Sequence, residues 1–124
     1  MRTDWRKYCC TPDITPDTDT AMVTFGNERK HMIRVEEADG EYRVWAIIAR
    51  QSIVAKHDDL QMRIWQRNHG SKLVSYRIDQ KGRLIGEAWV PKAGLTEDEF
   101  RLYARTVAAE CDRLEYLMTG RDFD

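Results

Sequence analysis

The chain has 124 residues and a mass of 14.6 kDa, the size of one ordinary domain, so we expect a single hydrophobic core. Hydrophobic residues make up 42% and charged residues 33%, a balance that excludes wholesale disorder. The formal charge of −1 excludes a strongly basic surface, so nucleic acid is not an expected partner. The longest uncharged run, residues 20–27, is far shorter than the roughly 20 residues that span a bilayer, so we expect no membrane segment.

The cysteine pattern predicts a reducing compartment. Cys9, Cys10 and Cys111 are an odd number with two adjacent, unlike the disulfide framework of a secreted domain. The adjacent pair lacks the spacer of a zinc or redox pair, so we expect no metal and no other cofactor. A charged start, with Asp4 soon after Arg2, also argues against a secretory signal. We therefore expect the protein in the cytoplasm.

Residues 1–20 are expected to form only a short turn, around residues 5–10, followed by a loop. The segment 11–20, TPDITPDTDT, is rich in Pro, Asp and Thr, which favour turns and loops over regular structure. We therefore divide the chain into an N-terminal stub of residues 1–20 and one domain of residues 21–122.

A β-hairpin is the clearest local pattern in the chain. Residues 31–37 alternate with the period of two that is typical of a half-buried strand, and they place Ile33 and Val35 on the inner side. Asp39-Gly40 suits a type I′ turn, and residues 41–50 return with β-branched and aromatic side chains. The two strands are therefore predicted to pair in antiparallel fashion.

The remaining elements before the C-terminus are shorter. Asp58 and Asp59 suit the first turn of a helix that ends near residues 68–71. Three further strands are predicted at Met22–Phe25, Leu73–Ile78 and Arg83–Val90, the last two joined by a turn at residues 79–82.

The final helix is the best-specified element. Thr96 and Glu99 form a capping box, Leu95 and Phe100 form a hydrophobic staple, and Gly120 is a natural stop. One apolar stripe recurs at helical spacing, and we expect it to pack on the sheet: Phe100, Tyr103, Ala104, Val107, Cys111, Leu114 and Met118. A second set lies off this stripe and suits either flank packing or a partner surface: Leu102, Ala109, Tyr116 and Leu117.

No catalytic pattern is visible, so we predict that the protein is not an enzyme. His31, His57 and His69 are scattered, no nucleophile motif or metal-binding helix motif accompanies them, and we expect each at the surface. The tryptophans are the other candidates for function. Trp45 and Trp89 are core residues if they face the helices, and they mark a binding surface if either faces outward.

The C-terminal third carries a family resemblance. Residues 86–122, GEAWVPKAGLTEDEFRLYARTVAAECDRLEYLMTGRD, resemble the strand, Gly-Leu-Thr helix entry and Asp-Arg-containing final helix of the YbjN-type branch of the type III secretion chaperone-like superfamily. The similarity covers about residues 21–122 and includes the hairpin at 31–50, Arg67-Asn68 and the turn at 79–82. The resemblance implies an α+β fold: an antiparallel, twisted sheet of about five strands, with a short middle helix and a long C-terminal helix packed on it.

The same resemblance implies a function. Secretion chaperones of that superfamily are small, acidic dimers that hold an extended segment of a client protein. It thus implies a non-catalytic, cytoplasmic chaperone-like or adaptor domain that forms a homodimer and binds a protein or peptide client through a sheet face or edge. We expect the client to contact the sheet residues Tyr42, Val44, Trp45, Tyr76 and Trp89. Exposed apolar residues of one hairpin or of the final helix, such as Leu102 and Tyr116, are the expected dimer interface.

Two other functions remain open from the residues. One is a small-molecule-binding or weakly enzymatic domain with a pocket between helix and sheet, whose polar contacts are Arg34, Arg77, Glu87 or Asp112. The other is a structural subunit of a larger assembly. A closed pocket with convergent polar groups favours the first, an open apolar groove favours peptide binding, and a large apolar patch without a pocket favours the last.

Overall fold

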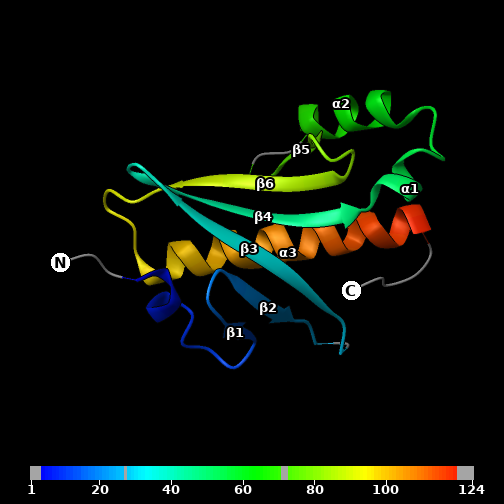
Figure 1. Ribbon diagram of the computed structural model, residues 1–124. Coiled ribbons are helices and arrows are strands. Elements are labelled where there is room, and N and C mark those ends of the chain that lie inside the picture. Colours follow the sequence, from blue (N-terminus) through cyan, green and yellow to red (C-terminus); the bar gives the residue numbers. More distant parts are fainter. Residues whose placement is uncertain (1–3, 27, 71–72, 120–124) are drawn as a thin grey trace.

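The computed structural model describes residues 4–26, 28–70 and 73–119 of the chain. It has the predicted α+β class: a six-stranded antiparallel sheet carries one long helix across one of its faces (Figure 1). In chain order the elements are η1 (Trp5–Tyr8), β1 (Ile14–Pro16), β2 (Thr20–Thr24), β3 (Lys30–Ala38), β4 (Glu41–Ala49), α1 (Gln51–Val54), α2 (Leu60–Gly70), β5 (Ser75–Ile78), β6 (Leu84–Pro91) and α3 (Glu97–Thr119).

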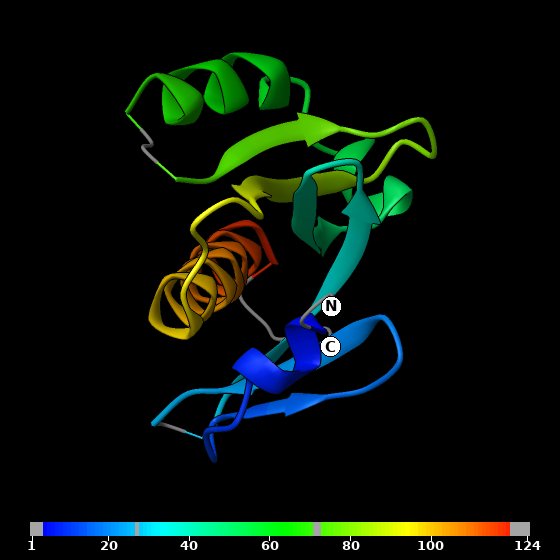
Figure 2. The same cartoon turned by 90° about the vertical axis from the view of Figure 1, so that its left-hand side faces the viewer.

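The strands lie in the order β1-β2-β3-β4-β6-β5, and each neighbouring pair is antiparallel. The predicted hairpin of β3 and β4 is confirmed, and Gly40 in its turn has a φ of 75°, which glycine adopts without strain. The predicted pairing of β5 with β6 is confirmed as well. Seen along α3, as in Figure 2, η1, β1 and β2 lie at one end of the sheet and α2 at the other.

The sheet has one strand more than the sequence predicted. The expectation of a loop over residues 11–20 is wrong at Ile14–Pro16, because these residues pair with β2 as the edge strand β1. Pro16 is tolerated there because an edge strand has no outer neighbour that needs the missing N–H group. The expected turn near residues 5–10 is present as η1, a single turn of 3₁₀ helix.

The N-terminal residues pack against the beginning of α3. The ring of Trp5 is buried and lies 5.9 Å from that of Phe100. Arg105 donates to the carboxylate of Asp13, and this hydrogen bond lowers the pKa of Asp13 to about 2. The described part of the stub, residues 4–20, is therefore packed against the rest of the domain.

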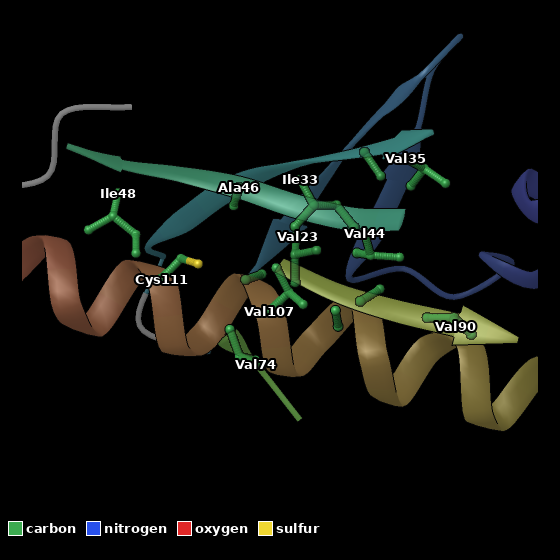
Figure 3. Packing of buried hydrophobic residues seen from close by; sticks show 14 of the residues in the cluster. Val23, Ile33, Val35, Val44, Ala46, Ile48, Val74, Val90, Val107 and Cys111 are labelled. Atoms are coloured by element: carbon green, nitrogen blue, oxygen red, sulfur yellow. The ribbon is translucent and has the colours of Figure 1, made fainter. Parts of the chain in front are cut away.

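The core lies between the sheet and α3, as Figure 3 shows. Alternate residues of the central strands point toward the helix and are buried, among them Val23, Ile33, Val35, Val44, Ala46, Ile48 and Val90. The predicted stripe of α3 meets them and is confirmed: Phe100, Ala104, Val107, Cys111 and Leu114 are buried. Burial of this apolar area is the main source of stability.

The helix α3 begins as predicted. The backbone N–H of Glu99 donates to Oγ1 of Thr96 at 3.2 Å, which satisfies one of the free amide groups of the first turn. The predicted stop, Gly120, lies outside the described residues. Although α3 has 23 residues, none of the helices in the described part of the chain is long and apolar enough to cross a membrane.

The middle of the chain differs most from the prediction. The helix α2 begins at Leu60, just after Asp58 and Asp59, and runs to Gly70, while Ser71 lies outside the described residues. The four-residue helix α1 was not predicted, since a single turn is too short to show a helical period. The strand β5 begins at Ser75 rather than Leu73.

One glycine sets how closely α3 approaches the sheet. A Cβ atom added at Gly86 of β6 would lie 2.5 Å from Sγ of Cys111 and 3.2 Å from Cγ1 of Val74. Such a short separation forces one group to move, and a close-packed core resists movement. Gly86 is therefore the point at which helix and strand come into direct contact.

We predict that Gly86→Ala destabilises the protein by about 1–3 kcal/mol, because the added methyl group overpacks the core against Cys111. Urea unfolding followed by circular dichroism measures this change. Combining Gly86→Ala with Cys111→Ala should recover part of the loss, since the opposing sulfur is gone. Gly26→Ala is a suitable control because a Cβ atom added at Gly26 would meet no other atom within 4 Å. Equal effects at Gly86 and Gly26 would contradict the packing argument.

Candidate functional site

The strand alternation divides the five predicted client-binding residues between two faces of the sheet. Tyr42, Val44 and Tyr76 point toward α3 and are buried. Their large apolar side chains fill the core, so they do not form an exposed client surface. This corrects the expectation that a client contacts them directly.

Trp45 and Trp89 lie on the opposite face, which no helix of the described residues covers in the way that α3 covers the first. Trp45 stands opposite Glu87 in the ladder of β4 and β6, and Trp89 stands opposite Arg43. Trp89 is 49% exposed, and Trp45 is partly buried. Both side chains thus point away from α3, and their contact with a client stays a prediction. We call this side of the sheet the open face.

Arginine side chains surround Trp45 on the open face. Their guanidinium carbons lie 5.5 Å (Arg34), 4.7 Å (Arg43) and 5.7 Å (Arg83) from the ring centroid. Cations over an indole ring are attracted by its negative π-face. Two of the three are also held by carboxylates, since Arg43 pairs with Glu87 and Arg83 pairs with Asp79. The centre of the open face is consequently well ordered before any partner binds.

Glu87 is the buried anchor of this arrangement. Its carboxylate is only 6% exposed and accepts hydrogen bonds from Nε of Arg43, at 2.8 Å, and from Nε of Arg77. Burial on its own raises the pKa of Glu87, but the hydrogen bonds from Arg77 and Arg43 outweigh it and bring the pKa below its ordinary value. Glu87 therefore stays ionised at neutral pH and fixes the positions of both arginines.

The two edges of the sheet are poorly suited to strand addition. At β5, the side chain of Asn68 accepts from the N–H of Tyr76 at 2.7 Å and donates to its carbonyl oxygen at 2.8 Å. At β1, Pro16 has no N–H group, and the N–H of Ile14 already donates to the carbonyl of Thr11 at 3.2 Å. Of the two routes expected for a client, the face of the sheet is the accessible one.

The predicted dimer residues are exposed on the outer side of α3. Leu102 is 54% and Tyr116 is 49% exposed. They lie off the buried stripe, in the same set as the exposed Leu117. The guanidinium of Arg29 lies 4.8 Å from the ring of Tyr116 and limits the freedom of that ring. These residues are available to a partner chain.

A groove runs between α2 and α3, with Tyr76 of β5 on its floor. It consists of two adjoining cavities, of about 300 Å³ and 450 Å³, that share Gln66, Arg67 and Tyr76. The smaller cavity is mostly apolar, with lining residues Leu60, Ile64, Leu84, Leu114, Leu117 and Met118. Burial raises the pKa of Tyr76 to about 12, so its hydroxyl stays neutral there. Sequence reasoning missed this groove because its two walls, α2 and α3, are separated in the chain by β5 and β6.

A buried polar cluster ties β3 to α3. His31 is 1% exposed, so the expectation of a surface position is wrong, and Asp112 and Glu115 are buried beside it. Nε2 of His31 lies 2.9 Å from the carbonyl oxygen of Ile47, and Nδ1 lies 3.4 Å from Oδ1 of Asp112. The strand alternation that places Ile33 inward also places His31 inward, and this signal could have revealed its burial.

This cluster is also where a metal ion would find ligands. One ligand atom each from His31, Asp112 and Glu115 lies within 4.8 Å of the others. However, Nη2 of Arg29 already pairs with Oδ2 of Asp112 at 2.9 Å, so a cation balances this carboxylate. Both ring nitrogens of His31 already face protein oxygen atoms, the carbonyl of Ile47 and the carboxylate of Asp112. The arrangement is that of an internally paired ionic network.

The polar residues suggested for a small-molecule site do not converge. Arg77 and Glu87 lie on the open face and pair with each other, and Arg34 lies there as well. Asp112 lies on the other side of the sheet, beside His31. No single pocket joins these four side chains in the described residues.

Three solved structures share this fold at low sequence identity. The heterodimeric ExoU–SpcU complex of the type III secretion system of Pseudomonas aeruginosa matches with a TM-score of 0.62 and 15% identity, over 85% of this chain and 87% of that chain. The ExsC–ExsE complex matches with a TM-score of 0.59 and 12% identity, over 80% and 75%. The Yersinia pestis type III secretion chaperone SycH, in complex with a fragment of YscM2, matches with a TM-score of 0.54 and 10% identity, over 89% and 92%.

These similarities show that the chain has the fold of type III secretion chaperones. At such identities they show the fold alone. No protein-family profile matches the sequence, and neither does any curated protein. The similar structures are all complexes of two proteins, and their partners are described in those structures only.

The Glu87 anchor generates a prediction about acid stability. Because its pKa is lower in the folded protein than in the unfolded chain, Glu87 stabilises the fold at neutral pH, and this contribution is lost as the pH falls below about 4.5 and through the lowered value. Glu87→Gln should therefore unfold more easily at pH 7 and show a flatter loss of stability between pH 5 and pH 3, about the range set by ordinary carboxyl pKa values. Urea midpoints across this range measure it. Parallel curves for the two proteins would contradict the role of Glu87.

Proposed function

We propose that this protein is a non-catalytic chaperone-like or adaptor domain that binds an extended segment of a client protein on its open face. The observation that carries the proposal is the pair Trp45 and Trp89 on the sheet face opposite α3, in a fold shared with chaperones solved in complex with protein partners. Aromatic side chains supply large contact area at low entropic cost, which suits them to protein recognition.

The chemistry of the open face suits a peptide better than a substrate. Its arginines are held by Glu87, Glu36 and Asp79 rather than aimed at one reacting position. Met32, on the same side of β3, adds adaptable apolar surface. An extended chain lying across the strands contacts these groups and the two tryptophans with alternate side chains.

The finer assignments belong to the same proposal. The resemblance of residues 86–122 supports a place in the YbjN-type branch of the superfamily. Free thiols at Cys9, Cys10 and Cys111, the second of them exposed, support a reducing compartment such as the cytoplasm. Burial raises the pKa of the Cys9 thiol to about 11, so this group is an inert part of the core.

We further propose that the protein forms a homodimer through the outer side of α3. The exposure of Leu102 and Tyr116 on one helix supports this interface, since apolar side chains off the buried stripe gain most from a second surface. A two-fold axis would place the same residues of both copies against each other.

The client-binding proposal is tested by selecting peptides from a displayed random library against the purified protein. Enriched peptides should bind the wild-type protein and Trp65→Ser alike but bind Trp89→Ser at least tenfold more weakly, roughly the loss expected for an aromatic hot spot. Trp65 is the matched control because it is an exposed tryptophan that belongs to α2 and not to a strand of the sheet. Failure to enrich any peptide, or equal binding by Trp89→Ser, would refute binding at the open face.

The dimer is tested by size-exclusion chromatography with light scattering at micromolar concentrations. The wild-type protein should have about twice the mass of the 14.6 kDa chain, and Leu102→Ser or Tyr116→Ser should shift it toward the monomer. Met62→Ser removes an exposed apolar side chain from α2 and should leave the dimer intact. A monomeric wild-type protein would exclude the dimer, and dissociation by Met62→Ser alone would move the interface to α2.

A further inference from the structure

We propose that the groove between α2 and α3 is a second client-binding site, which takes an apolar side chain followed by a carboxylate in the client segment. This inference rests on the proposed function, since it names the chemistry of one part of the client. It concerns the opposite side of the molecule from the open face and uses none of the same side chains.

The groove exists because α2 does not close onto α3. Among the described side chains of α2, Leu60 is the single buried one, and Ile64, one turn later, is only partly buried. Leu117 of α3, which also lines the smaller cavity, is largely exposed. Apolar groups therefore line a cavity of about 300 Å³ without filling it. Filling it with an apolar side chain removes area from water and is favourable by roughly 25 cal/mol per Å².

The positive charge beside the smaller cavity favours a carboxylate next to the apolar side chain of the client. Arg63 and Arg67 both line the smaller cavity, and none of its described lining residues is acidic. The helix α2 itself contains no Asp or Glu. Arg67 is already oriented, with its guanidinium 5.9 Å from the ring of Tyr76. Two guanidinium groups beside an apolar cavity are complementary to a carboxylate attached to an apolar body.

The adjoining cavity indicates that the carboxylate belongs to a polypeptide. This second cavity of about 450 Å³ continues from Arg67 and Tyr76, and polar groups (Gln66, Thr106 and Glu110) line it together with the apolar side chains of Leu73 and Val74. A backbone needs such partners for its N–H and C=O groups, whereas a simple fatty acid does not. The smaller cavity thus holds the anchoring side chain, and the larger one, which offers hydrogen-bonding groups beside apolar surface, accommodates the chain that leads away from it.

The probe for the experiment is a short Gly/Ser peptide with one central Leu-Glu pair, titrated into the ¹⁵N-labelled full chain and followed by NMR. Backbone amide shifts should move at Ile64, Tyr76 and Leu114. The matched Leu-Gln peptide should bind about tenfold more weakly, the loss expected for one charge-assisted hydrogen bond. A Ser-Glu peptide lacks the apolar anchor and should bind more weakly still.

The variants connect the selectivity to the two arginines. Arg63→Gln or Arg67→Gln should weaken the Leu-Glu peptide about tenfold and leave the Leu-Gln peptide nearly unaffected, so that the discrimination disappears. Arg113→Gln is the matched control, since Arg113 is an exposed arginine of α3 that lines a different cavity. The unliganded NMR spectrum of each variant shows whether it is folded.

Three results would overturn the inference: no shifts in the groove, equal affinity for the Leu-Glu and Leu-Gln peptides, or an equal effect of Arg113→Gln. Octanoate is titrated in parallel, and shifts with octanoate but not with the peptide would reassign the groove to a small carboxylic acid. If selected peptides bind in a Trp89-dependent way but the Leu-Glu peptide causes no NMR shifts at groove residues, the inference about the groove is refuted and the proposed function is not. If the Leu-Glu peptide binds in the groove but no library peptide is selected at the open face, the proposed function is refuted and the groove remains a peptide-binding site.

Discussion

The contact between Gly86 and Cys111 controls the rest of the architecture. Because β6 carries no side chain at this position, α3 lies directly on the sheet, and its apolar stripe reaches the inward residues of the neighbouring strands. Most strand residues then face either the dry interface with α3 or the open face, and Ile85 is an exception because it points away from α3 and is nevertheless fully buried. The segregation of tryptophan and arginine from aliphatic core residues follows from this single constraint, since side chains alternate along a strand.

The two faces have different physical tasks. The face under α3 supplies stability through burial, and its few polar groups, around His31 and Asp112, are paired with each other. The open face keeps aromatic surface accessible and uses buried Glu87 to hold its arginines in place. Preorganisation of this kind lowers the entropy that a partner must lose on binding. A small domain can thus be rigid and still offer a broad surface for recognition.

Much of this fold was predictable from local patterns. The hairpin at Asp39-Gly40, the capped start of α3 and its buried stripe follow from turn chemistry and periodicity, and all are present. The candidate site was predicted less well, because knowing that a residue lies in a strand does not tell which face it occupies. The face that a strand residue occupies depends on how the strands pair across the sheet. In β4 this places Val44 toward α3 and its neighbour Trp45 on the open face. β1 was not predicted because the prolines in residues 11–20 are typical of loops. The groove was not predicted because its lining residues come from segments that are distant in the chain.

The side chain of Asn68 has a consequence for how the protein associates. By bonding to both backbone groups of Tyr76, it occupies the position that an added strand would take at β5. At the other edge of the sheet, Pro16 of β1 has no N–H group to offer to an added strand. A sheet with unprotected edge strands runs the risk of polymerising with copies of itself through those edges. Because strand addition is disfavoured at both edges of the sheet, copies of the protein associate through side chains rather than through backbone hydrogen bonds. This favours small finite assemblies over fibrils.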